Sequence, residues 1–305
     1  MTQNNLLKGV FLVGLGATSY GMLATFVKIA YNAGYTTAEL TTSQFVYGLM
    51  GLLLINLFQK KTSKTAIVKP STKNVMQLII AGTSTGLTSL FYYLAVKYID
   101  VSIGIVLLMQ TVWMGVLLEW VLDKKAPSLQ KTLAVFVVLI GTALAINIFK
   151  IDFNDASTDW SKGLFWGLLA AASFTTTMFT ANRIATHVSA AQRSLLMLIG
   201  GAVIVFSFAL VTQVDPFNFE IFMKWGIVLA LFGTIIPPML LNAGFPHTGI
   251  GLGSIVASLE LPVSVLMAYF LLNEQVILIQ WLGIILIILA IVIMNFNFKK
   301  KNQMK

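Results

Sequence analysis

One carboxylate lies far from any connecting loop. Glu260 is about twelve residues into the apolar segment 249–272. A charged side chain in the middle of a membrane-spanning helix is costly unless it faces a partner or a water-filled cavity. Because removal from water disfavours the charged form, a carboxylate placed there can take up and release a proton. Glu260 is therefore a candidate for proton coupling or for binding a cationic group, and the alternative is a protonated Glu260 bonded to a neighbouring helix.

Other polar and aromatic side chains lie within apolar segments, where they could hydrogen-bond a small solute. The set that we expect to bind substrate together with Glu260 is Tyr20, Gln44, Tyr92, Gln110, Trp113, Asn242 and Ser264. Polar residues at such places also join helices to one another, so packing is the competing interpretation for each of them. Glu119 lies near the end of its segment, and we expect it to pair with Lys124 or Lys125.

Several kinds of chemistry are excluded by what the chain lacks. It has no cysteine, so it has neither a disulfide framework nor a thiolate metal site. His187 and His247 are sixty residues apart, and no acidic ligand cluster accompanies them. The sequence contains no HExxH or phosphate-binding loop motif, which argues against a metalloprotease and an ATP-driven pump. We predict no metal, no cofactor and no enzymatic activity.

The composition is that of a membrane protein. Of the 305 residues, 57% are hydrophobic and 10% are charged, whereas soluble domains carry about 25% charged residues. The mean hydropathy is +0.87. The net charge of +9 comes from Lys and Arg in short loops, without the basic, aromatic-interleaved surface of a nucleic-acid-binding protein.

A helix needs about 20 apolar residues to cross the hydrocarbon core. Ten segments meet this requirement: 8–29, 38–58, 75–97, 101–122, 130–149, 161–183, 190–212, 222–245, 249–272 and 276–297. Hydrocarbon offers the backbone no hydrogen-bond partner, so each segment must be helical. The predicted fold class is an all-α integral membrane protein with ten transmembrane helices.

The distribution of Lys and Arg predicts the orientation, because cytoplasmic loops are enriched in these residues. The side that holds the N-terminus carries 15 of them and the other side 5. The 15 are Lys8, Lys60, Lys61, Lys64, Lys69, Lys73, Lys124, Lys125, Lys131, Arg183, Arg193, Lys299, Lys300, Lys301 and Lys305. Both termini are therefore predicted to be cytoplasmic.

The two halves of the chain resemble each other. Residues 92–134 align without gaps with 242–284 at an offset of 150, which places Gln110 opposite Glu260. At an offset of 154, Ser19-Tyr20 aligns with Ser173-Phe174. Five segments in each half mean that the second copy crosses the membrane in the opposite direction. Inverted repeats are common in transporters, with the binding site near the midplane between the halves.

Prolines are concentrated in the second half. Pro237, Pro238, Pro246 and Pro262 fall within 26 residues, and the first half has no proline inside a segment. Each proline in a helix frees a carbonyl group and favours a kink. We predict Pro237, Pro238 and Pro262 as hinges.

The second half also carries a recognisable pattern. Leu259-Glu-Leu-Pro-Val263 is followed by Phe270-Leu-Leu-Asn-Glu274 and then by Gln280-Trp-Leu-Gly283. An apolar Pro-Val helix, an acidic turn and a Gln-x-x-Gly helix start resemble the EamA type of the drug/metabolite transporter superfamily.

The first half departs from this pattern. Val112 replaces the proline, Lys124 the glutamate and Leu133 the glycine. The resemblance nevertheless extends over both halves, and it implies a solute exporter or exchanger that works by alternating access. We expect a first repeat at 8–149, an outer linker at 150–160, a second repeat at 161–297 and a basic cytoplasmic tail at 298–305.

The expected function is secondary active export or exchange of a small polar metabolite, most simply an amino acid or a related compound. The partners are then this solute, the lipid bilayer and protons as the candidate coupling ion. Two alternatives remain open: efflux of lipophilic cations, and a non-transporting membrane enzyme or scaffold. The resemblance and the Lys-rich loops together favour the inner (plasma) membrane.

The inverted arrangement predicts that residues 60–73 and 215–220 lie on opposite sides of the membrane. Single cysteines placed in the two segments should react with an impermeant reagent from opposite sides, against a background free of native cysteine. Labelling of both from the same side would rule out the inverted repeat.

Overall fold

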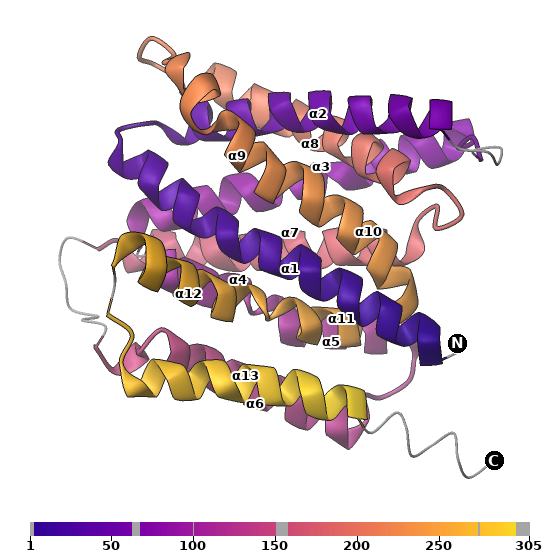
Figure 1. Ribbon diagram of the computed structural model, residues 1–305, viewed down its shortest axis with the longest axis vertical. Coiled ribbons are helices and arrows are strands. Elements are labelled where there is room, and N and C mark those ends of the chain that lie inside the picture. Colours follow the sequence, from indigo (N-terminus) through magenta and orange to yellow (C-terminus); the bar gives the residue numbers. More distant parts are fainter. Residues whose placement is uncertain (1–2, 63–67, 100, 151–157, 274, 297–305) are drawn as a thin grey trace.

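The computed structural model describes residues 3–62, 68–99, 101–150, 158–273 and 275–296. All regular structure in these residues is helical (Figure 1). The predicted tail 298–305 and most of the predicted linker 150–160 lie outside the described residues.

The helices follow the predicted segments closely. The first half contains α1 (Gln3–Asn32), α2 (Thr37–Thr62), α3 (Thr72–Tyr98), α4 (Val101–Leu108), α5 (Thr111–Asp123), α6 (Leu129–Ala145) and the short η1 (Ile148–Lys150). The second half contains α7 (Trp160–Arg183), α8 (Ala190–Thr212), η2 (Phe222–Gly226), α9 (Ile227–Ala230), η3 (Leu231–Ile235), α10 (Ile236–Thr248), α11 (Ile250–Ala257), α12 (Glu260–Leu272) and α13 (Leu278–Phe296).

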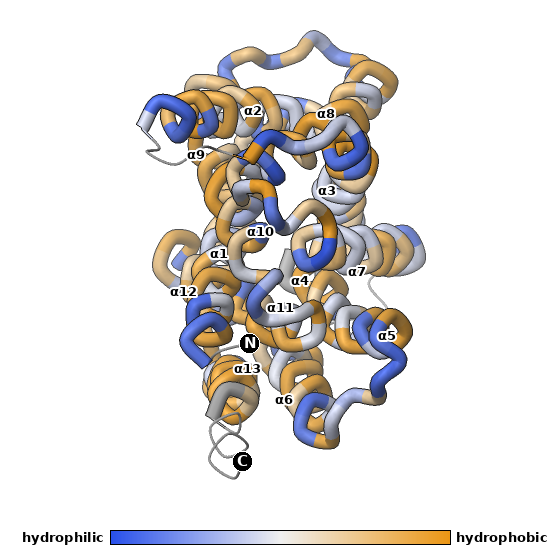
Figure 2. The backbone as a smooth tube through the Cα atoms, turned by 90° about the vertical axis from the view of Figure 1, so that its right-hand side faces the viewer, coloured by the Kyte–Doolittle hydropathy of each residue, from blue (hydrophilic) through white to orange (hydrophobic). Residues whose placement is uncertain are grey.

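Eight stretches of the described chain are helical, long and apolar enough to cross a membrane. Three of them join several elements: Ile103–Asp123 joins α4 and α5, Phe222–Thr248 joins η2 to α10, and Ile250–Leu272 joins α11 and α12. The apolar parts of α6 and α13, Leu129–Ala145 and Leu278–Met294, are shorter. Large apolar side chains such as Phe11, Phe58 and Phe136 are exposed on the outside, where lipid would cover them. Seen end-on, the helices are largely hydrophobic, and hydrophilic residues gather in the connections (Figure 2). The protein is a multi-pass membrane protein, and the full count of ten crossings stays a prediction.

The first helices of the two halves run in opposite directions. α1 begins at the end of the bundle where α7 finishes, and α13 finishes at the end where α1 begins (Figure 1). The α2 terminus at Thr62 and the connection between α8 and η2 lie at opposite ends of the bundle. The helix directions are therefore those of an inverted repeat.

The two halves are interlocked. α1 packs on α10, α11 and α12 of the second half, and α7 packs in the same way on α3, α4 and α5 of the first half. α2 lies against α8, and α6 lies against α13 (Figure 1). Most of the helix packing therefore joins one half to the other.

Two segments that the sequence predicts as continuous helices are broken. In 101–122 the break separates α4 from α5 at Met109-Gln110, and in 249–272 it separates α11 from α12 at Ser258-Leu259. The backbone N–H of Gln110 donates to the Leu107 carbonyl at 3.1 Å, and that of Leu259 donates to the Val256 carbonyl at 3.2 Å. These tighter i→i−3 bonds replace the α-helical ones.

The breaks correct two inferences from sequence. The first half breaks without a proline, so proline placement does not distinguish the halves at this point. The equivalent residues at the breaks are Gln110 and Leu259, which share the same bond pattern and backbone angles. Their offset is 149 rather than 150, so the counterpart of Glu260 is Thr111 and not Gln110.

Small residues let α3 and α8 cross closely. A Cβ atom added to Gly82 would overlap the backbone of Met197, and one added to Gly200 would overlap the carbonyl of Ile79. Close approach of this kind is typical of membrane helix interfaces.

We expect Gly82→Val to lower the melting temperature in detergent by roughly 5 °C or more, because the crossing has no room for a side chain. Ala172→Val, on an exposed face of α7, is the matched control and should change it little. Equal melting temperatures for the two variants would contradict the close crossing.

Candidate functional site

A cavity of about 600 Å³ lies between the two halves. The residues that line it are Tyr20, Leu23, Ala24, Gln44, Thr85, Thr88, Ser89, Tyr92, Tyr93, Leu108, Phe174, Thr177, Gly233 and Glu260. They come from α1, α2, α3 and α4 of the first half and from α7, η3 and α12 of the second. We call this space the central cavity. Four of the predicted site residues meet in it: Tyr20, Gln44, Tyr92 and Glu260.

Glu260 is the first residue of α12, directly after the helix break. Its side chain is only 5% exposed, and its Oε2 atom has no hydrogen-bond partner. A helix N-terminus carries partial positive charge, which stabilises a nearby carboxylate. The break therefore places the acidic group at the wall of the cavity and partly offsets the cost of its burial.

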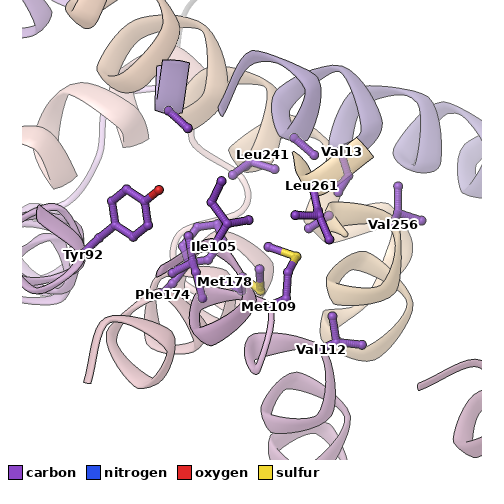
Figure 3. Close-up of a cluster of buried hydrophobic side chains, with 14 of the residues drawn as sticks. Val13, Tyr92, Ile105, Met109, Val112, Phe174, Met178, Leu241, Val256 and Leu261 are labelled. Carbon is purple, nitrogen blue, oxygen red and sulfur yellow. The ribbon is translucent and has the colours of Figure 1, made fainter. Parts of the chain in front are cut away.

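Two more polar groups in the cavity wall lack partners. The hydroxyls of Tyr92 and Thr85 are buried without a hydrogen bond. The side chain of Tyr92 extends from its helix with the hydroxyl at its tip (Figure 3). Buried polar atoms in proteins are almost always hydrogen-bonded, so unpartnered ones in a cavity indicate a place for water or a ligand.

Neighbouring Tyr93 differs. Its hydroxyl donates to Oε1 of Gln44 at 2.7 Å, and this bond ties α3 to α2. The Oε1 atom of Gln44 therefore takes part in a hydrogen bond between two helices. Tyr93 also lines the central cavity, although it was not among the predicted site residues.

The ring of Tyr20 contacts that of Phe174 edge to face, with centroids 5.7 Å apart and planes at 87°. The repeat aligns these two residues with each other. A pair of equivalent residues in contact marks the place where the two halves meet around their common axis.

Asn242 lies in a second, smaller cavity of about 390 Å³. This space, which we call the second cavity, is lined by Tyr20, Thr85, Phe174, Thr177, Met178, Ala181, Ser194, Met197, Leu198, Pro238, Leu241, Asn242 and Phe245. Four of these residues also line the central cavity: Tyr20, Thr85, Phe174 and Thr177. Nδ2 of Asn242 donates to Ser194 at 2.9 Å, and Oδ1 has no partner.

The remaining predicted site residues lie elsewhere. Ser264, one turn after Glu260, lines a third cavity with Thr25 and Gln280. Gln110 accepts a hydrogen bond from Nε1 of Trp113 at 2.9 Å, and Trp113 is 37% exposed on the outside. Neither Gln110 nor Trp113 lines the central or the second cavity, and neither does Thr111, the structural counterpart of Glu260.

The predicted hinges lie beside the cavities. Pro237 and Pro238 follow the π-helical turn η3, and Pro262 is the third residue of α12. Pro237 has no N–H to donate to the carbonyl of Gly233, a residue that lines the central cavity. Whether these places bend during function stays a prediction.

Two charged residues correct the sequence analysis. Glu119 pairs with Lys131 at 2.5 Å and not with Lys124 or Lys125. Arg193, counted above as a loop cation, is 1% exposed inside the bundle. No group of three His, Cys, Asp or Glu side chains that could hold a metal ion occurs among the described residues.

The two adjacent tyrosines provide a test of the cavity. Tyr92→Phe removes a hydroxyl that bonds nothing in the protein, so stability should change by less than about 0.5 kcal/mol. Tyr93→Phe is the matched control and should cost about 1 kcal/mol, because the acceptor on Gln44 loses its partner. Thermal melts in detergent would measure both, and a larger loss for Tyr92→Phe would contradict the assignment.

Comparison with known proteins agrees with this architecture. The sequence matches the model of the EamA-like transporter family over residues 7–147 and 161–296, once in each half. A solved structure described as "Crystal structure of protein" is similar, with a TM-score of 0.73 and 13% identity, and the match covers 92% of this chain and 97% of that one. At this identity the likeness concerns the fold alone. The comparison with curated proteins finds no match. The family match covers most of the sequence, and the chain belongs to the EamA-like transporter family.

Proposed function

We propose that this protein is a secondary active transporter that exports or exchanges a small polar metabolite bearing an amino group, most simply an amino acid or a related compound. The observation that carries the proposal is a buried carboxylate, Glu260, whose Oε2 atom has no partner and which lines a cavity built by both halves. Family membership supports transport in general.

The charge of the cavity favours a cationic group. Among the described residues that line the cavity, Glu260 is the only carboxylic acid, and none is Lys or Arg. A charge buried there needs a counterion or a proton. An ammonium group and a proton would therefore compete for the same carboxylate, and this competition couples solute movement to proton movement.

The rest of the wall suits a solute that is polar at one end and apolar at the other. Hydroxyls of Thr85, Thr88 and Ser89 can bond its polar atoms, while the rings of Tyr20 and Phe174 can cover an apolar side chain. Binding sites for small molecules commonly combine a mostly apolar wall with a few polar groups.

A second candidate, efflux of lipophilic cations, is favoured by one observation: the central cavity offers aromatic rings and a single acid, and no basic side chain that would pair with a carboxylate. Cations bind well over aromatic faces. A thermal-shift screen with amino acids and cationic dyes separates the two candidates, because only true ligands stabilise the protein.

Alternating access would follow from the inverted repeat, since exchange of the two halves' conformations would expose the site to the other side. We propose that the protein lies in the inner (plasma) membrane with both termini in the cytoplasm. The excess of Lys and Arg at the end where α1 begins supports this orientation.

In proteoliposomes, Glu260→Gln should abolish the pH dependence of transport and lower its rate by at least about tenfold, because the amide can exchange neither a proton nor a counterion. Glu220→Gln, which removes an exposed partner of Lys224, is the control and should retain both rate and pH dependence. Unchanged transport by Glu260→Gln across pH would remove Glu260 from the mechanism.

A further inference from the structure

The second cavity is the counterpart of the central cavity in the repeated architecture. Hydrogen bonds at the helix ends show which residues of the two halves correspond to each other. Thr36 caps α2 as Ser189 caps α8, at an offset of 153. The N–H groups of Ile99 and Gly249 close α3 and α10 in the same way, at an offset of 150. With the offset of 154 for α1 and α7, every helix around the two cavities has a defined partner.

These offsets relate several residues in the walls of the two cavities, although Thr111, the counterpart of Glu260, does not line the second cavity. Tyr92, Thr88, Gln44 and Ala24 of the central cavity correspond in turn to Asn242, Pro238, Met197 and Met178 of the second. Tyr20 and Phe174, which correspond to each other, line both cavities. The second cavity is thus a smaller and more apolar counterpart of the central one, and the Tyr20–Phe174 pair belongs to the walls of both.

A buried arginine lies beside the second cavity. Nη1 of Arg193 donates to the carbonyl of Asn242 at 2.7 Å. Nη2 donates to the carbonyls of Thr180 at 3.0 Å and Ala181 at 2.6 Å. Arg193 therefore joins α8 to α7 and α10 through backbone groups, and no carboxylate contacts its side chain in the part of the chain that the structure describes.

Two of the carbonyl groups that Arg193 binds, those of Asn242 and Ala181, lack a backbone donor in their own helix. The residue four positions after Asn242 is Pro246, which has no N–H, so the carbonyl of Asn242 lacks its helical donor. Ala181 belongs to the last turn of α7, where carbonyls lack helical partners, whereas the carbonyl of Thr180 also accepts from the N–H of Ile184 at 3.0 Å. Hydrogen bonds from a charged donor in a buried place are strong.

The corresponding place in the first half has no such connection. The counterpart of Arg193 at the offset of 153 is Leu40, which cannot donate, and the counterpart of Pro246 is Val96, whose N–H is available to the helix. The hydrogen bonds of Arg193 therefore join helices beside the second cavity, and they have no counterpart beside the central cavity.

We propose that the second cavity is the closed half of the solute pathway, which takes the same amine-bearing solute once it opens, and that Arg193 is the latch that holds it closed. This proposal rests on the proposed function in so far as the pathway serves transport. When the latch opens, the carbonyls of Asn242 and Ala181 separate from Arg193, and the second cavity widens as the central cavity narrows.

Cysteine reactivity tests the latch without any solute. The chain has no native cysteine, so Ala181→Cys reports on the second cavity and Ala24→Cys on the central one. The full-length protein in lipid nanodiscs is treated with an impermeant thiol reagent, which reaches both faces. In the otherwise unchanged chain, Ala181→Cys should react more slowly than Ala24→Cys.

Two changes should open the latch. Arg193→Gln removes the charged donor, and Pro246→Ala supplies an N–H that competes for the carbonyl of Asn242 while it keeps the arginine. Each should raise the reaction rate of Ala181→Cys by about tenfold and lower that of Ala24→Cys. Should Arg193→Gln fail to fold, Pro246→Ala decides the question alone, because it restores a regular helical bond.

Unchanged rates in a variant that elutes as a folded protein would overturn the latch. Because the labelling needs no transport, it tests the Arg193 latch separately from the proposed transport function. Opening without any transported solute would keep the latch and overturn the proposed function, whereas transport with unresponsive labelling would overturn the latch alone.

Discussion

A carboxylate buried near the middle of an apolar bundle is the constraint on which the rest of the structure depends. Glu260 is 5% exposed and its Oε2 atom bonds nothing in the protein. Such a group is tolerable in a membrane only beside a cavity that admits water, a proton or a cation. The central cavity supplies this surrounding, and it needs helices from both halves to enclose it.

The backbone meets this constraint by breaking the helices that reach the cavity. α4 ends and α5 begins near Thr111, as α11 ends and α12 begins at Glu260. Irregular backbone within a membrane is tolerated where it is buried in protein or lines a cavity. At the same place α1 of one half packs on α11 and α12 of the other. The candidate site and the contact between the halves are therefore the same region, as the proposed alternating access would require.

Much of this could be predicted from the sequence, because hydropathy and repetition act over long stretches. The helical segments and the two repeats follow from composition and spacing, and Tyr20, Gln44 and Tyr92 do line the same cavity as Glu260. Gln110 and Trp113 do not, and the offset between the halves changes from 150 to 149 between α3 and α5, so that Gln110 is not the counterpart of Glu260. A gapless alignment of apolar residues cannot detect a shift of one residue, yet on a helix such a shift turns a side chain by about 100°.

Arg193 shows the other limit of sequence reasoning. A basic residue four positions after a polar turn is typical of a loop cation, and nothing near it in the sequence indicates burial. Its place depends on the carbonyl that Pro246 frees 53 residues later. The sequence also gives no sign of the helix break at Gln110, since no proline or glycine lies at the break itself. Contacts between distant segments decide both features.

Proton release on solute binding tests most directly whether Glu260 exchanges a proton for a cationic group. The purified protein, in weakly buffered solution at a pH where Glu260 is protonated, is mixed with the amine-bearing ligand that a thermal-shift screen identifies. Close to one proton should be released for each ligand bound, and none by Glu260→Gln. Ligand binding without proton release, or equal release by both proteins, would contradict the exchange.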